Sequence, residues 1–405
     1  MATERGREAS TEYFGHDAPG VYREREFGLP RRIEFSTGVP AFLGRTPPGL
    51  TGRVPAGRKS VREPVMLTLW SKFERELIGA PSDSFLPYAV RGFFRNGGRR
   101  CYVVPLEDST VTSLLHALEA IEPLNAVDLV CAPDLTGEKK EILELQQMVV
   151  NHCETMGNRF AILDSRKNDD RDGVWTQWSE IDGRNGAIYY PWVKVRGSGG
   201  GATLVPPCGH VAGVYARTDR ERGVHKAPAN EVLEGVIDLE RNLTDDDQDY
   251  LNPKRVNCLR SFVGRGIRVW GARTLSGQDI WTYVNVRRVF LTAVRWIEWN
   301  MGAVVFEPNT PQLWARIERE LTAYFRTQFR AGAFKGRTPE EAFYVKCDAE
   351  TNPPELRDLS QVVTEIGLAP NLPFEFVVVR IIHGERGVSI MGPMDPHNSQ
   401  KENPR

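Results

Sequence analysis

Residues 206–216, near the middle of the chain, read PPCGHVAGVYA. The glycine-rich run GSGGGAT at 197–203 stands just before them and is of the kind that cradles a phosphate group. It lacks the Lys-Ser/Thr pair of a P-loop, and no helix is clearly predicted after it. GRGIRVWG at 264–271 has Gly-x-Gly without the third glycine of a dinucleotide site. Both runs are therefore predicted to be turns, and no nucleotide cofactor is expected.

Neither the histidines nor the acidic runs predict a metal site. The seven histidines form neither HxxxH nor HExxH, the spacings that bring two imidazoles to one metal ion. The run LTDDDQDYLN at 243–252 lacks the glycine and the final glutamate of an EF-hand loop. Thr244 followed by Asp247 instead predicts the N-cap of a helix.

The composition is that of a soluble globular protein with room for two or three domains. The chain has 405 residues, of which 40% are hydrophobic and 26% charged. Its net charge of -1 gives no general attraction to nucleic acid or to an anionic membrane. No apolar run approaches the ~20 residues that span a bilayer, and the polar start predicts no secretory signal peptide. The six cysteines form no CxxC pair, which predicts buried, reduced thiols in a protein folded in the cytoplasm.

The first half of the chain alternates short apolar runs with amphipathic helices. RRCYVVPL, AVDLVCAP and RFAILD are predicted strands, and TVTSLLHALEAIE and GEKKEILELQQMVVNHCETMG are predicted helices between them. A further helix, FLPYAVRGFFRNGG, is predicted to end at Gly97 and Gly98. AIYYPWVKV at 187–195 reads as one more strand. This alternation predicts an α/β domain with a largely parallel sheet.

The pattern changes towards the C-terminus. Residues 283–300 and 311–329 are predicted helices, the first with Val286, Phe290, Ala293 and Ile297 on one stripe and the second with Leu313, Ile317, Leu321 and Phe325 on one stripe. AFYVKCD and FEFVVVRII are predicted strands. We therefore predict an N-terminal arm at 1–27, an α/β domain at 28–280, a separate α+β domain at 281–390 and a polar tail at 391–405.

The predicted arm contains the stretch APGVYREREF at 18–27. With a strand's period of two, one face is apolar at its ends and basic between, and the other is acidic beyond its tyrosine. Neither face suits the core of its own domain. The arm is therefore expected to pair with something else, with folding back on its own subunit as the alternative.

PPCGHVAGVYA resembles the helix that follows the nucleophile in subtilisin-like proteases. Alignment on residues 210–213 places Val205 where the serine should stand, and valine offers no nucleophilic atom. No Asp-x-Gly strand end or His-Gly-Thr segment supplies the other members of a triad. The resemblance thus implies the fold and not the reaction.

The longer segment PPCGHVAGVYARTDRERGVHKAPAN resembles the signature region of contractile tail sheath proteins of phages, R-type pyocins and phage-tail-like contractile injection systems. Further segments match the family in the same order: PGVYREREF, FFRNGGRRCYVV, LNPKRVNCLRSFVGRGIRVWGARTLS, VVFEPNTPQLW, GAFKGRTPEEAFYVKCDAETNP and LAPNLPFEFVVVRI. The resemblance covers nearly the whole chain. The modest length favours the compact sheaths of pyocins and injection systems.

The resemblance implies a subtilisin-like middle domain without a catalytic triad, and a structural role without enzymatic activity, cofactor or metal. It implies a six-start helical homo-oligomer of hexameric rings around an inner tube protein, with baseplate proteins, tail-end cap proteins and sheath paralogues as further partners. Neither nucleic acid nor direct membrane insertion is expected. Assembly is expected in the bacterial cytoplasm, with the particle extracellular after release.

Three groups of residues follow from the resemblance. The inter-subunit arm comprises Val21, Tyr22, Arg23, Glu24, Arg25, Glu26 and Phe27. The C-terminal strand comprises Phe374, Phe376, Val377, Val378, Val379, Arg380 and Ile381. The tube contact comprises Arg326, Arg330, Lys335 and Arg337, from a stretch with six basic and three acidic residues. The alternative for this last group is a solvated basic helix end.

Two other classes of protein stay open at this point. A catalytically dead or divergent subtilisin-like hydrolase is the first alternative. A nucleic-acid-binding protein is the second, because VRRVFLTAVRWIEW mixes arginines with Trp296 and Trp299. That helix is better explained as one that packs in the core.

Overall fold

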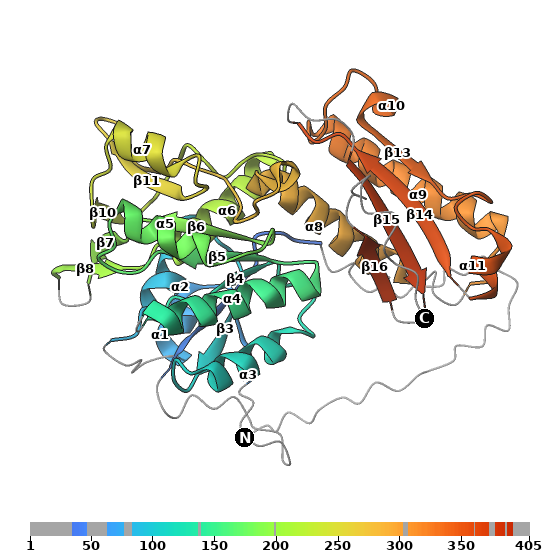
Figure 1. Cartoon of the computed structure of the whole chain (residues 1–405). Coiled ribbons are helices and arrows are strands. Elements are labelled where there is room, and N and C mark those ends of the chain that lie inside the picture. The colour runs from blue at the N-terminus through green and yellow to red at the C-terminus, as the bar shows by residue number, and fades with distance from the viewer. Residues whose placement is uncertain are drawn as a thin grey trace, which may run out of the picture. The chain divides into compact units, whose positions relative to one another are not determined.

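The computed structural model describes residues 35–46, 63–76, 83–136, 139–197, 200–302, 307–359, 361–371, 377–384 and 387–391 (Figure 1). The predicted arm residues 21–27, together with Phe374 and Phe376, lie outside the described residues. The described residues, from Phe35 onwards, group as one compact unit. The boundaries predicted at 27/28, 280/281 and 390/391 remain predictions.

A mostly parallel sheet organises the first part of the chain (Figure 1). It has nine strands in the order β2-β3-β1-β4-β5-β6-β11-β12-β9. Neighbours from β3 to β11 are parallel, whereas β2, β12 and β9 are antiparallel to their neighbours. The strands are β1 (Pro40–Arg45), β2 (Val65–Leu67), β3 (Cys101–Leu106), β4 (Leu129–Cys131), β5 (Phe160–Asp164), β6 (Gly186–Tyr190), β9 (Glu231–Val232), β11 (Asn257–Phe262) and β12 (Gly266–Val269). The predicted parallel α/β sheet is confirmed.

Helices cover both faces of this sheet, which explains why its strands are apolar throughout. Phe42 belongs to a core cluster shared with α2 and α6, and the next residue, Leu43, belongs to a cluster shared with α3 and α4. The helices are α1 (Trp70–Glu76), α2 (Leu86–Arg95), α3 (Val111–Ile121), α4 (Lys139–Met156), α5 (Arg171–Ser179), α6 (Cys208–Arg222) and α7 (Asp245–Leu251). Gly97 adopts φ +99° after α2, and Thr244 and Asp247 form a capping box at α7, as predicted.

The sequence prediction was wrong at two places near the middle of the chain. Residues 187–195 form two strands, because the chain leaves the large sheet at Pro191, which has no N–H to donate. A strand also begins within the glycine-rich run, where only a turn was predicted, and the helix that PPCGHVAGVYA resembles comes after this strand. That strand belongs to a small antiparallel sheet in the order β10-β7-β8, formed by β7 (Val193–Arg196), β8 (Ala202–Val205) and β10 (Val236–Leu239).

The C-terminal part has a core cluster of its own. The predicted stripes of α8 (Val284–Asn300) and α9 (Pro311–Arg330) both contribute to it. A four-stranded antiparallel sheet completes this part, in the order β13-β14-β15-β16. Its strands are β13 (Phe343–Lys346), β14 (Val362–Leu368), β15 (Val377–Gly384) and β16 (Gly387–Met391), and the remaining elements are η1 (Asp279–Trp281), α10 (Pro339–Ala342) and α11 (Pro354–Asp358).

Two of these four strands were not predicted. Glu365 and Gly367 interrupt the apolar pattern of β14, and β16 is short and ends at Met391, where the polar tail was predicted to begin. All six cysteines are buried and unpaired, as predicted. Among the described residues, no helix has the length and apolar character to cross a membrane.

Candidate functional site

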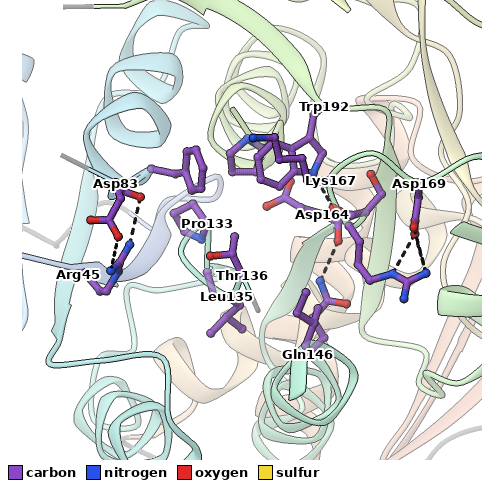
Figure 2. A pocket seen from close by; sticks show the side chains of 16 residues that line it. Arg45, Asp83, Pro133, Leu135, Thr136, Gln146, Asp164, Lys167, Asp169 and Trp192 are labelled. Atoms are coloured by element: carbon purple, nitrogen blue, oxygen red, sulfur yellow. Dashed lines mark hydrogen bonds and ion pairs between the residues drawn. The ribbon is translucent and has the colours of Figure 1, made fainter. Parts of the chain in front are cut away.

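The first candidate site is a pocket of about 530 Å³ at the carboxyl ends of β1, β4 and β5 (Figure 2). Open α/β sheets bind ligands at this edge of the sheet. Arg45 and Asp83 lie on one side of the pocket, and Lys167, Asp169 and Trp192 lie on the other (Figure 2). A site for small-molecule chemistry, if the fold carries one, is therefore expected here.

Asp164, the last residue of β5, is the most perturbed acid in the pocket. Its Oδ1 accepts a hydrogen bond of 2.7 Å from the backbone N–H of Cys208, the first residue of α6. Its carbonyl oxygen accepts a further bond of 2.8 Å from Nε2 of Gln146. Burial raises the pKa of the Asp164 carboxyl to about 7, because hydrogen bonds from the side chain and the backbone amide of Cys208 do not offset the loss of solvent.

The other charged groups of the pocket are paired with one another. Nη1 of Arg45 lies 2.9 Å from Oδ2 of Asp83, and Arg166 lies 2.9 Å from Asp169. The ammonium of Lys167 lies 5.9 Å from the centre of the Trp192 ring. Lys167 is thus left with an aromatic ring and no carboxylate partner in these contacts, whereas the two arginines are neutralised by ion pairs.

The pocket has no activated nucleophile among the residues that line it. Val205, at the predicted serine position, is the last residue of β8 and is fully buried in the core. Burial also raises the pKa of the Cys208 thiol well above its usual value. Ser165 lines the pocket, but no histidine does, and a serine nucleophile needs such a base. The only histidine on α6, His210, is buried in neutral form, since burial lowers its pKa to about 4.

The second candidate site is the outer face of α9. Its inner face buries Leu313, Ile317, Leu321 and Phe325, as predicted. Arg319, Arg326 and Arg330 are exposed and follow each other at spacings of seven and four residues, which places them on one stripe. Within the described part of the chain, none of the three forms an ion pair.

The structure places Arg326 and Arg330 of the predicted tube contact on one stripe and adds Arg319, which was not among the residues predicted for that contact. Lys335 is half-buried and Arg337 is exposed, both in the loop between α9 and α10. Arg316, three residues before Arg319, differs from the stripe residues in being paired with Glu307 and with Glu320. Helical spacing alone would have grouped the three stripe residues.

The predicted C-terminal strand lies inside the four-stranded sheet. Residues 377–381 belong to β15, which pairs with β14 on one side and with β16 on the other. The edges of the sheet are therefore β13 and β16. Within the described ranges, each of these two strands pairs with another strand on one side only.

Sequence reasoning missed that the arginines of α8 are buried. Arg287, Arg288 and Arg295 are each at most 8% exposed and bind groups of the first part of the chain. They are not part of a basic surface, which removes the observation that favoured nucleic-acid binding. No local signal reveals this, since arginines on an amphipathic helix usually face solvent.

Known proteins resemble the chain both in sequence and in structure. The family model of the phage tail sheath protein central domain matches residues 107–275. The tail sheath protein of Salmonella phage ViI is 24% identical over 295 residues, which is 68% of this chain and 45% of that protein. The tail sheath protein of Burkholderia phage BcepMu is 35% identical over 111 residues, 25% of this chain and 23% of that protein. The chain thus spans less than half the length of these curated relatives.

Solved structures match over nearly their full length. A chain of the anti-feeding prophage baseplate superposes with a TM-score of 0.72 and 31% identity, covering 89% of this chain and 97% of that one. A chain of the contracted helical sheath of the same particle superposes with a TM-score of 0.71 and 30% identity, covering 88% of this chain and 97% of that one. A chain of the contracted sheath complex of the PVC extracellular contractile injection system superposes with a TM-score of 0.69 and 28% identity, covering 89% of this chain and 96% of that one.

The mixed α/β fold and these matches define a structural protein of phage tails and tail-like particles. The chain belongs to the contractile tail sheath family.

Proposed function

We propose that this chain polymerises as a sheath around an inner tube, is stored in an extended metastable form, and contracts to drive the tube through a target envelope. The observation that carries the proposal is the match over 97% of a chain from a contracted helical sheath at 30% identity. The energy of contraction is stored in subunit packing, so neither a nucleotide nor another cofactor takes part.

The partners follow from the same assembly. The chain forms a six-start helical homo-oligomer of hexameric rings, and it meets an inner tube protein, baseplate proteins and tail-end cap proteins. Sheath paralogues share the particle, which assembles in the bacterial cytoplasm and acts outside the cell after release. The similarity to chains of both a baseplate and a contracted sheath supports this set of partners.

Strand exchange connects the subunits. The arm residues 21–27 leave their own subunit and add to an edge of a neighbour's four-stranded sheet, at β13 or β16. Residues 377–381 of the predicted C-terminal strand, which belong to β15, lie in the interior of that acceptor sheet. Each backbone hydrogen bond so formed contributes about 0.5–1.5 kcal/mol, so an arm contributes a few kcal/mol whatever its sequence.

The stripe of α9 touches the tube. Arg319, Arg326 and Arg330, with Lys335 and Arg337 beyond the end of the helix, face an acidic tube surface. Exposed ion pairs contribute only ~0–1 kcal/mol each and weaken with salt. Such contacts, repeated over every subunit, guide assembly along the tube and still release it on contraction.

The middle domain, at 28–280, has a subtilisin-like fold and no catalytic activity. Val205 at the serine position and the absence of a histidine among the residues lining the pocket support this assignment. The same two observations argue against the alternative of a divergent subtilisin-like hydrolase.

Electron microscopy of the recombinant chain tests the proposal. The full chain is expected to form wide hollow cylinders, alone or on co-expressed tubes. A hydrolase or a nucleic-acid-binding protein is not expected to do so. A preparation that stays monomeric with and without tube protein would contradict the assignment.

A further inference from the structure

Four charged side chains are buried together where the described chain begins. Asp128 immediately precedes β4, Asp219 lies on α6, and Arg288 and Arg295 lie on α8. They are 5%, 8%, 2% and 5% exposed, respectively. Two carboxylates and two guanidinium groups balance each other, which is what allows the cluster to be buried.

Arg288 is the centre of the cluster. Its Nη1 and Nη2 lie 2.7 and 2.6 Å from the two carboxylate oxygens of Asp219, a bidentate pair. Nη2 also lies 3.3 Å from Oδ2 of Asp128. The two acids come from different elements, so this one side chain ties α8 to both β4 and α6.

Arg295 connects the cluster to the chain at residues 35 and 36. Its Nη1 lies 3.7 Å from Oδ2 of Asp128, and both of its Nη atoms lie 3.3 Å from the carbonyl oxygen of Ser36. Its guanidinium also lies 5.2 Å from the centre of the Phe35 ring. Nη2 donates further bonds of 3.1 Å to the carbonyls of Asn125 and Ala126.

Residues 38 and 39 are held by the same carboxylate. The backbone N–H of Gly38 donates to Oδ2 of Asp128 at 2.9 Å, and that of Val39 donates to Oδ1 at 2.6 Å. Gly38 adopts φ +71°, and a Cβ atom there would lie 2.5 Å from Cα of Ala216 on α6. Only glycine permits this close approach. The chain at 35–39 is therefore clamped between α6, α8 and the start of β4.

The opposite side of α8 belongs to the C-terminal core. Val286, Phe290, Ala293 and Ile297 pack there with residues of α9 and of the four-stranded sheet. A pull on the chain that precedes Phe35 therefore passes through Ser36 and Asp128 to Arg288 and Arg295, and so into α8. An apolar cluster would stabilise folding as well, but hydrophobic attraction is non-directional, whereas a bidentate ion pair fixes the positions of both side chains.

Resting on the proposed function, we propose that Asp128, Asp219, Arg288 and Arg295 form a mechanical anchor that transmits load between the N-terminal arm and the C-terminal part of the same subunit. The four side chains fix the position of residues 35–39 relative to α8. They hold the root of the arm against α8 while neighbouring subunits pull on the arm during contraction.

Arg295→Met removes the charge and all the donors while keeping much of the apolar volume, so it breaks the anchor at the root of the arm. Arg287→Met is the matched control. Arg287 is also buried on α8, but its Nε donates to Oδ1 of Asn185 at 2.6 Å, away from residues 35–39. Arg295→Lys restores the charge with fewer donors and is the rescue variant.

Hydrogen exchange of the full chain gives the first readout. Arg295→Met is expected to speed exchange of the Gly38 and Val39 amides roughly ten- to a hundredfold, the factor that corresponds to losing a charge-assisted contact. Arg287→Met is expected to leave these two amides unchanged, although both variants lower the melting temperature. Unchanged exchange in Arg295→Met would overturn the anchor. If Arg295→Met does not fold, the same comparison is made with Arg295→Lys, which keeps the charge but loses donors and is expected to speed exchange of the same two amides by a smaller factor, and unchanged exchange in it would overturn the anchor.

Contraction of assembled sheaths gives the second readout. Sheaths of Arg295→Met are expected to form on tubes and to break into short pieces when contraction is triggered by warming or by dilute urea. Those of Arg287→Met are expected to contract intact, and those of Arg295→Lys to break less often. Intact contraction of Arg295→Met with its amides deprotected overturns the mechanical role alone. If the wild-type chain forms no sheath, that result contradicts both the proposed function and this inference.

Discussion

Reversing two charges on the outer face of α9 tests the tube contact. The variant is Arg326→Glu with Arg330→Glu. Both arginines are exposed, and neither forms an ion pair within the part of the chain that the structure describes. The same helix is held in the core through its other face, so the substitutions leave its packing untouched.

The cost to folding is small. Arg330 lies in the last turn of α9, where a positive charge stabilises the helix by about 0.3–1 kcal/mol, so its reversal to glutamate costs about twice that. Arg326→Glu changes the free energy of unfolding by about 0.5 kcal/mol or less. Together the two substitutions are expected to lower the melting temperature by about 2–4 °C or less. The cost to assembly is larger, because two contacts of ~0–1 kcal/mol each become repulsive in every subunit along the tube.

The assay is the yield of extended sheath on tubes, counted by electron microscopy at low ionic strength. The control is Arg99→Glu with Lys140→Glu, two exposed basic residues outside the C-terminal part whose reversal changes the net charge equally. We expect the α9 variant to lose sheath and the control to keep it. Normal yield of extended sheath from the α9 variant would refute the tube contact.

Three further outcomes follow from the sequence and the structure. Deletion of residues 1–27 is expected to leave a folded, soluble protein that no longer assembles, and normal-length sheaths from it would show that the arm is dispensable. Purified protein is expected not to hydrolyse peptides or esters above background, and activity that survives repurification and is lost on mutating one residue would contradict this. Asp164→Asn is expected to raise the melting temperature more at pH 8 than at pH 5, because burial raises the pKa of Asp164 to about 7. Between about pH 4 and pH 7 the folded protein keeps this proton while the unfolded chain loses it, so the wild type loses stability as pH rises, by a few kcal/mol at most. An equal effect at both pH values would show that Asp164 is charged in the folded protein.

The parts of the fold that local patterns specify could be predicted from the sequence. Strands buried on both faces are apolar throughout, so β3, β4 and β5 were recognisable as members of a parallel sheet. The stripes of α8 and α9 follow from their helical period, and both lie in the C-terminal core. The caps at Gly97 and Thr244 depend on neighbouring residues only.

The remaining features depend on residues distant in sequence. β14 is recognisable only beside β15, because Glu365 and Gly367 break its pattern. The partners of Arg288 lie 69 and 160 residues away, so nothing local distinguishes it from a solvent-exposed arginine. Arg319 is an intermediate example, since the helical period was sufficient to place it beside Arg326.

The length of the sheath on its tube, measured by cryo-electron microscopy before and after triggering, tests the central claim most directly. Particles made by co-expressing this chain with its tube and baseplate proteins are expected to show a long, narrow sheath that becomes shorter and wider and leaves the tube projecting. The change is expected to occur without added nucleotide. A cylinder of constant length and width under every trigger would contradict a contractile sheath.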